Sequence, residues 1–126
     1  MTKDIIDIAR ASYQAYVAKD RAAIEGLFAE DFHFTSPLDN RIDRATYFQR
    51  CWPNSESLVA FEFIHLVPHR DKVLVTYEGH GTDGHRFRNT EILTVRDGKI
   101  TEAEVYFGWS IPHAARRGGF VDTKDA

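Results

Sequence analysis

One acidic residue, Glu91, lies in a stretch that otherwise has the pattern of two strands joined by a turn. The stretch is NTEILTVRDGKITEAEVYF, residues 89–107, and in it Glu91 shares one side of its strand with Leu93 and Val95. A carboxyl group held among apolar side chains has its charged form disfavoured, so its pKa rises. Such a group can exchange a proton near neutral pH, which makes Glu91 a candidate catalytic acid. The alternative is a structural carboxyl group, satisfied by Arg88, a tyrosine or the backbone.

The register of the hairpin around Gly98 decides which side of the sheet Glu91 occupies. A two-residue turn would place Glu91 opposite Glu104, which puts like charges together. A three-residue loop, with Gly98 in the left-handed position, places Glu91 opposite Ala103 and facing the interior. We therefore predict the three-residue loop. Its inner face continues through Val105, Phe107 and Trp109, and its outer face carries Thr90, Ile92, Thr94, Glu102, Glu104 and Tyr106.

The elements that must hold this carboxyl group follow from the rest of the pattern. Apolar residues recur at helical spacing over residues 5–17, and a second short helix follows Asp20. A brief strand ends at Pro37, and after a polar loop at 38–42 Asp43 caps a third helix. That helix covers residues 44–52, and strands follow over 58–67, 72–81, 85–96 and 99–110. Helices followed by turn-linked strands predict an α+β fold, with a mostly antiparallel sheet whose one face the helices cover.

Composition and charge limit the class of protein. The chain has 126 residues, 43% hydrophobic and 13% aromatic, which fits one soluble domain with an apolar core or pocket. Its formal charge of -3 offers no basic surface to phosphates, so we expect no nucleic-acid partner. No apolar run has the length of a membrane-spanning helix and no signal peptide is recognised, so we expect no membrane association and a cytoplasmic location.

Domain organisation and partners follow from the same pattern. We expect one domain over residues 1–112 and a C-terminal tail over 113–126, because the tail has no periodicity. No histidine pair has the spacing of a metal motif, so neither a metal nor another cofactor is expected. The outer face with Thr90, Ile92 and Tyr106 would be a broad apolar surface if left in water, which favours a homodimer through it.

The order of elements resembles that of a known superfamily. The segments LFAEDFHFTSP (27–37) and NTEILTVRDGKITEAEVYFG (89–108) together resemble the NTF2-like superfamily, and within it the SnoaL-like branch. The resemblance covers residues 5–109, and the closing strand pair is its most specific part. It implies an NTF2-like (cystatin-like) cone, in which a strongly curved sheet wraps around helices and encloses a deep pocket. Members include ketosteroid isomerases, polyketide cyclases, dehydratases, epoxide hydrolases and non-catalytic binding domains, so the fold does not fix the function.

Two residues of the isomerase pattern, its tyrosine and its protonated acid, have counterparts in this chain. Tyr13 falls where those enzymes keep a tyrosine that donates to the substrate oxygen, and Glu91 falls where they keep a second, protonated acid. Phe107 falls on an aromatic residue that lines the pocket. The resemblance thus implies Glu91 and Tyr13 as catalytic residues, acting on a small, largely apolar carbonyl or hydroxyl compound by isomerisation, cyclisation or dehydration.

The general base of the isomerase pattern has no counterpart at the expected position. The proton-abstracting aspartate should stand directly before Pro37, where this chain has Ser36, and serine is no general base at neutral pH without help. Asp39 and Asp43 lie just downstream, and either substitutes only if the loop folds back over the pocket. The loss of the aspartate favours the alternative function, a pocket that binds its ligand without turnover.

Other candidate pocket residues come from the predicted faces. His65 shares the parity of Phe61 and Phe63 along its strand, and Cys51 lies late in the third helix, where it suits the mouth of the cone. An epoxide hydrolase site is only partly imitated, by Arg88 with Asn89 and Glu91. The residues predicted to bind the ligand are Tyr16, Ser36, Asp39, Tyr47, Cys51, Trp52, Phe63, His65, Asn89, Phe107 and Trp109.

Overall fold

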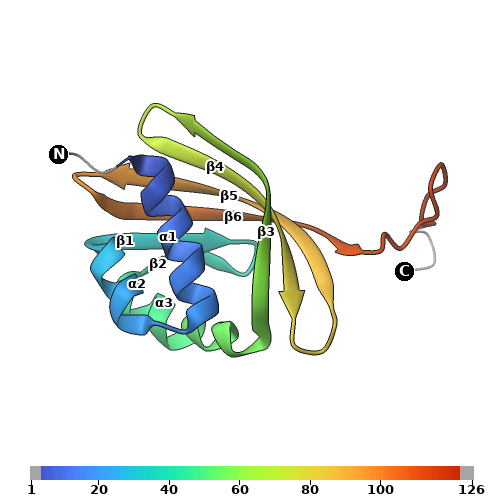
Figure 1. Ribbon diagram of the computed structural model, residues 1–126, viewed down its shortest axis with the longest axis horizontal. Coiled ribbons are helices and arrows are strands. Elements are labelled where there is room, and N and C mark those ends of the chain that lie inside the picture. The colour runs from blue at the N-terminus through green and yellow to red at the C-terminus, as the bar shows by residue number, and fades with distance from the viewer. Residues whose placement is uncertain (1–3, 123–126) are drawn as a thin grey trace.

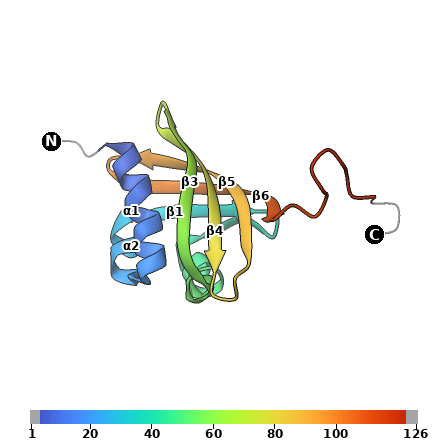
Figure 2. The ribbon, with the colours of Figure 1, turned by 45° about the vertical axis from the view of Figure 1, so that its right-hand side comes forward.

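A curved six-stranded sheet, with the helices on one face, forms the body of the protein in the computed structural model, which describes residues 4–122 (Figures 1 and 2). The strand order is β2-β1-β6-β5-β4-β3, and within these strands only the β1–β6 pair is parallel. The predicted α+β fold is therefore confirmed. The elements are α1 (Ile5–Ala18), α2 (Arg21–Leu27), β1 (Phe28–Ser36), β2 (Asp39–Asp43), α3 (Arg44–Arg50), a 3-10 helix (Trp52–Ser57), β3 (Leu58–His69), β4 (Lys72–Gly81), β5 (Arg86–Arg96) and β6 (Lys99–Ile111).

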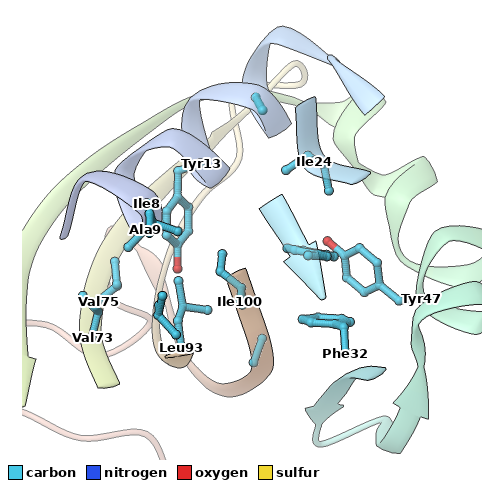
Figure 3. Packing of buried hydrophobic residues seen from close by; sticks show 14 of the residues in the cluster. Ile8, Ala9, Tyr13, Ile24, Phe32, Tyr47, Val73, Val75, Leu93 and Ile100 are labelled. Carbon is cyan, nitrogen blue, oxygen red and sulfur yellow. The ribbon is translucent and has the colours of Figure 1, made fainter. Parts of the chain in front are cut away.

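Helix α1 lies across the concave face of the sheet and supplies much of the core. It begins after Asp4, whose side chain accepts a hydrogen bond from the Ile6 amide at 2.8 Å, and ends at Lys19 in the left-handed conformation. Its apolar stripe packs on the inner face of β4 and β5 (Figure 3). The facing residues are Ile8, Ala9 and Tyr13 on the helix and Val73, Val75 and Leu93 on the strands.

The polar loop predicted at residues 38–42 is instead part of a hairpin. Ser36 pairs with Asp39, so the chain reverses within two residues and β2 runs back along β1 as a short edge strand. The Ser36 hydroxyl holds this reversal, because it accepts from the Leu38 amide at 3.0 Å and donates to Asp39 Oδ2 at 2.7 Å. The third helix ends at Arg50, two residues earlier than predicted, because a 3-10 turn begins at Trp52.

The hairpin between β5 and β6 closes differently from the prediction. Arg96 pairs with Lys99 around a two-residue turn in which Asp97 and Gly98 both have positive φ, at 52° and 76°, so the three-residue loop is wrong. A bulge then inserts Thr101 into β6. The bulge shifts the partner of Glu91 by one residue, from Glu104 to Val105, so Glu91 lies opposite neither Glu104 nor the predicted Ala103. The shift restores the predicted parity, and Glu91 faces the interior as expected.

The described chain extends beyond the sheet at its C-terminal end. After β6 ends at Ile111, residues 112–122 form an irregular segment that projects away from the body (Figures 1 and 2). Residues 1–3 of the predicted domain and 123–126 of the predicted tail lie outside the described residues. Within residues 4–122, none of the helices has the length and apolar character needed to cross a membrane.

Candidate functional site

A pocket of about 300 Å³ opens between the helices and the concave face of the sheet. Ten of its 25 lining residues are Phe or Tyr, which accounts for much of the aromatic content of the chain. These rings come from α1, α3 and all the strands except β2, so the pocket exists only once the sheet has curved around the helices. A concave, mostly apolar pocket with a few polar groups is the usual form of a small-molecule site.

The main polar group in the wall of the pocket is Glu91, which two tyrosines hold. Tyr13 Oη on α1 donates to Glu91 Oε1 at 3.0 Å, and Tyr77 Oη on β4 donates to Glu91 Oε2 at 2.8 Å. Asn89 Nδ2 donates to Tyr77 Oη at 3.2 Å, and Asn89 Oδ1 accepts from the Gly108 amide at 3.2 Å. Each carboxylate oxygen therefore has one phenol donor, and Tyr77 is itself oriented by an amide fixed to β6.

The strand register brings these groups together. On β4 and β5, Val75 pairs with Glu91 and Tyr77 pairs with Asn89, so the three polar side chains lie on one face of two neighbouring strands. Tyr77 is not among the residues predicted from the sequence. Its signal was present, because Tyr77 has the same parity as the apolar Val73 and Val75 in the strand KVLVTYE.

Burial changes the acidity of this cluster. It raises the pKa of Glu91, although the bonds that Tyr77 and Tyr13 donate to the carboxylate act in the opposite direction. Burial, and then the nearby Glu91 charge, also raise the pKa of Tyr13 and of Tyr77. Both phenols therefore keep their protons at neutral pH, and Glu91 is the group of the three that can exchange one.

A second acidic group, Asp39, lies on the pocket wall at the β1–β2 hairpin. Its side chain is only 11% exposed, and it receives the hydrogen bond from Ser36 described above. Arg50 Nε lies 3.6 Å from Asp39 Oδ1, but the Arg50 side chain is 64% exposed, so this ion pair is screened by water. Burial, and then the Asp39 charge, raise the pKa of the nearby Cys51 thiol to about 11, so this residue is no thiolate nucleophile at neutral pH.

Two strands of the sheet, β1 and β6, lie between Asp39 on β2 and Glu91 on β5. Thr35 on β1 pairs with Glu104 on β6, and the next residue of β6, Val105, pairs with Glu91. Ser36, which holds Asp39, is therefore about two strand spacings, roughly 10 Å, from Glu91 along one row of the sheet. Asp43 lies elsewhere, because its carboxylate caps α3 by accepting from the Thr46 amide at 2.9 Å.

Four predicted ligand-binding residues do not line the pocket. A bulge in β3 pairs Phe63 with Tyr77 but His65 with Thr76, so the predicted parity of His65 is wrong and its side chain is exposed on the outer face. Phe63 packs behind Tyr13, at 5.4 Å between ring centroids. Trp52 packs behind Tyr16 at 5.5 Å, and Trp109 borders a shallow open groove beside Phe107.

The remaining predicted site residues all line the pocket. They comprise the two predicted catalytic residues and seven of the predicted ligand-binding residues, and their roles in binding or catalysis stay predictions. The nine residues are Tyr13, Tyr16, Ser36, Asp39, Tyr47, Cys51, Asn89, Glu91 and Phe107.

The arginine of the partial epoxide hydrolase pattern belongs to a different cluster. Arg88 pairs with Glu78, 3.8 Å from Arg88 Nε, while Asn89 faces the pocket. Glu78 also accepts from Arg86 Nε at 2.8 Å and lies 3.2 Å from His80 Nε2. Glu62, Glu78 and His80 have ligand atoms within 4.8 Å of one another, a spacing that suits a metal ion. The two arginines already neutralise Glu78, which argues against a cation at this place.

Comparison with known proteins agrees with this architecture. A structure from Kribbella flavida is 26% identical, with a TM-score of 0.73 over 82% of this chain and 85% of that chain. A proposed ketosteroid isomerase from the same organism is 19% identical, with a TM-score of 0.70 over 95% and 89%. An epoxide hydrolase of the LEH-like type from M. tuberculosis is 18% identical, with a TM-score of 0.69 over 82% and 81%. The last two structures are less than 25% identical to this chain, so the likeness to them shows the fold alone.

Sequence comparison decides the family. Among curated proteins, no sequence matches significantly. The model of the SnoaL-like domain matches residues 9–103, which includes most of α1, nine of the ten pocket rings and Glu91. The chain therefore belongs to the SnoaL-like domain family of the NTF2-like superfamily.

Proposed function

We propose that this protein binds a small, largely apolar molecule in the pocket and holds its polar end at Glu91, Tyr13 and Tyr77. The observation that carries the proposal is the Glu91 cluster, a satisfied polar group in the wall of a cavity that is otherwise mainly apolar. A cavity of about 300 Å³ is within the range of small-molecule sites. The fold supports the proposal only in general terms, because it hosts many functions.

The binding proposal is tested by filling the pocket. Ala103 lines the pocket and is 5% exposed, so Ala103→Leu places three extra carbons in the space that a ligand needs. Ala22→Leu makes the same change at an exposed position of α2. The probe is prodan, a neutral, environment-sensitive dye of naphthalene size that carries a ketone. We expect saturable, blue-shifted emission with the wild type and Ala22→Leu, and its loss in Ala103→Leu with the melting transition retained. Equal binding by both variants, or no binding by the wild type, would contradict the proposal.

A second candidate function is acid–base catalysis on the bound molecule, and the position of Asp39 favours it. The hairpin brings Asp39 onto the pocket wall beside Ser36, near the place where the isomerase pattern has its aspartate. In this reaction Asp39 removes a proton from the carbon beside a ketone, and returns it at the far end of the double bond. Between the two steps a protonated Glu91, which Tyr13 and Tyr77 hold in place, donates a hydrogen bond to the enolate oxygen.

The catalytic candidate is tested with a β,γ-unsaturated cyclic ketone, whose conversion to the conjugated isomer is followed by ultraviolet absorbance. Asp39→Asn removes the proposed base, and we expect a loss of about 10²- to 10⁴-fold in rate. Asp43→Asn is the matched control, because asparagine caps a helix as well as aspartate does and Asp43 does not line the pocket. Isomerisation that survives Asp39→Asn would exclude Asp39 as the base. If the wild type shows no turnover, binding is the only proposed function that remains.

A further inference from the structure

We infer that the ligand of this pocket is a cation, an organic ammonium group on a largely apolar skeleton. This inference rests on the proposed function and narrows its ligand class. Two carboxyl groups, Glu91 and Asp39, reach the pocket, whereas none of the described residues that line it is Lys, Arg or His. A ligand carboxylate or phosphate would meet two acids and no positive partner, so the lining selects against anions.

The hydrogen bonds at Glu91 favour a ligand that donates. Tyr13 and Tyr77 both spend their O–H groups on the carboxylate, and one N–H of the Asn89 amide is spent on Tyr77. A carboxylate offers about four acceptor sites, of which these two phenols fill two. As a carboxylate, Glu91 therefore has free capacity only for accepting, and a ligand carbonyl would find both phenol donors already engaged. An ammonium group brings three N–H donors to the same place.

Aromatic rings surround the same carboxyl group. The ring of Tyr13 lies 5.1 Å from that of Phe61 and 5.4 Å from that of Tyr77, and Phe61 lies 4.9 Å from Tyr77. Aromatic faces attract an alkylammonium ion, and the attraction is stronger where the ion is shielded from water. Rings and a carboxylate together recognise an amine by two independent means, whereas a neutral apolar ligand would use the rings alone.

Proton exchange at Glu91 supplies a signature of this ligand. The ionisable groups around Glu91 are Tyr13 and Tyr16 on α1, Tyr47 on α3 and Tyr77 on β4. Asp39 and Cys51 line the same pocket, and none of these six groups is a cation. An incoming ammonium ion provides the missing positive charge and favours the carboxylate form. The ammonium ion keeps its own protons, so when it binds the protonated acid, the proton that leaves the Glu91 carboxyl group passes to the buffer.

The inference is tested with three probes on one skeleton: phenylbutylamine, phenylbutanol and phenylbutyrate. Calorimetric titration at neutral pH should show the amine binding at least about tenfold more tightly than the alcohol, and the acid no more tightly than the alcohol. Titrations repeated at a pH below the measured titration midpoint of Glu91, in buffers of different ionisation enthalpy, should show protons released with the amine and none with the alcohol. An alcohol that binds as tightly as the amine would overturn the inference and leave the proposed function standing. If none of the three binds, the inference fails, and prodan binding decides separately whether the proposed function stands.

Substitution of the acid separates its role from that of the rings. Glu91→Gln should lower the affinity for the amine to that for the alcohol and abolish the proton release, while alcohol binding shows that the pocket is still folded. Glu30→Gln makes the same change at an exposed position of β1 and should leave the amine preference intact. A preference that survives Glu91→Gln would overturn the assignment of the ammonium group to Glu91. If Glu91→Gln does not fold, the wild-type comparison and its proton release decide the question.

Discussion

The hydrogen bond from Tyr77 to Glu91 can be tested by removing one oxygen atom. Tyr77→Phe deletes the phenol that donates to Glu91 Oε2 at 2.8 Å and keeps the ring that packs 4.9 Å from Phe61. A bond donated to a carboxylate stabilises its charged form, so its removal must raise the pKa of Glu91 further. A hydrogen bond to a charged group contributes about 1.5–3 kcal/mol, and one pKa unit corresponds to about 1.4 kcal/mol. We therefore expect an upward shift of about one to two units.

The assay is a titration of the Glu91 carboxyl carbon by NMR, in the wild type and in the variant. Tyr106→Phe is the matched control, because it removes the same oxygen from a side chain that is 51% exposed on the outer face, and it should leave the Glu91 titration unchanged. Tyr13→Phe should shift the pKa in the same direction as Tyr77→Phe, since Tyr13 donates to the other carboxylate oxygen at 3.0 Å. An unchanged or lowered pKa in a folded Tyr77→Phe protein would refute the description of Glu91 as a carboxylate held by two phenols.

Three further predictions concern stability and assembly. Burial raises the pKa of Glu91 above that of the unfolded chain, so the stability it contributes is present at acidic pH and is lost as pH rises through the folded-state pKa. In urea unfolding at several pH values, Glu91→Gln should remove this decline, and an unchanged decline would contradict it. Gly98→Ala, at a φ of 76°, should destabilise the fold by about 1–2 kcal/mol, whereas Gly26→Ala in α2, where a Cβ meets nothing within 4 Å, should stabilise it. If urea unfolding shows that both glycine substitutions change the free energy of unfolding in the same direction, the predicted difference is wrong. We also propose a homodimer through the outer sheet face, which Tyr106→Lys should weaken, and a 14.4 kDa species in sedimentation of the wild type at high concentration would exclude it.

The inward orientation of Glu91 was predictable because side-chain parity along a strand is a local property. The apolar neighbours Leu93 and Val95 already mark one face of β5 as buried. The turn itself was mispredicted, because a two-residue turn with a bulge at Thr101 preserves the same parity as a three-residue loop. The bulge in β3 had no such compensation, and for this reason the prediction for His65 failed.

The sequence by itself determined the order of helices and strands apart from β2, the family and the side of the sheet on which Glu91 lies. These features depend on periodicity and on motifs of neighbouring residues, which are visible along the chain. Only the tertiary structure decided that Tyr77 and Tyr13 both donate to Glu91, and that the hairpin brings Asp39 into the same pocket. These contacts join residues that are far apart in the chain or follow from one tight reversal, so they depend on bulges, register and sheet curvature that arise only when all the strands pack together.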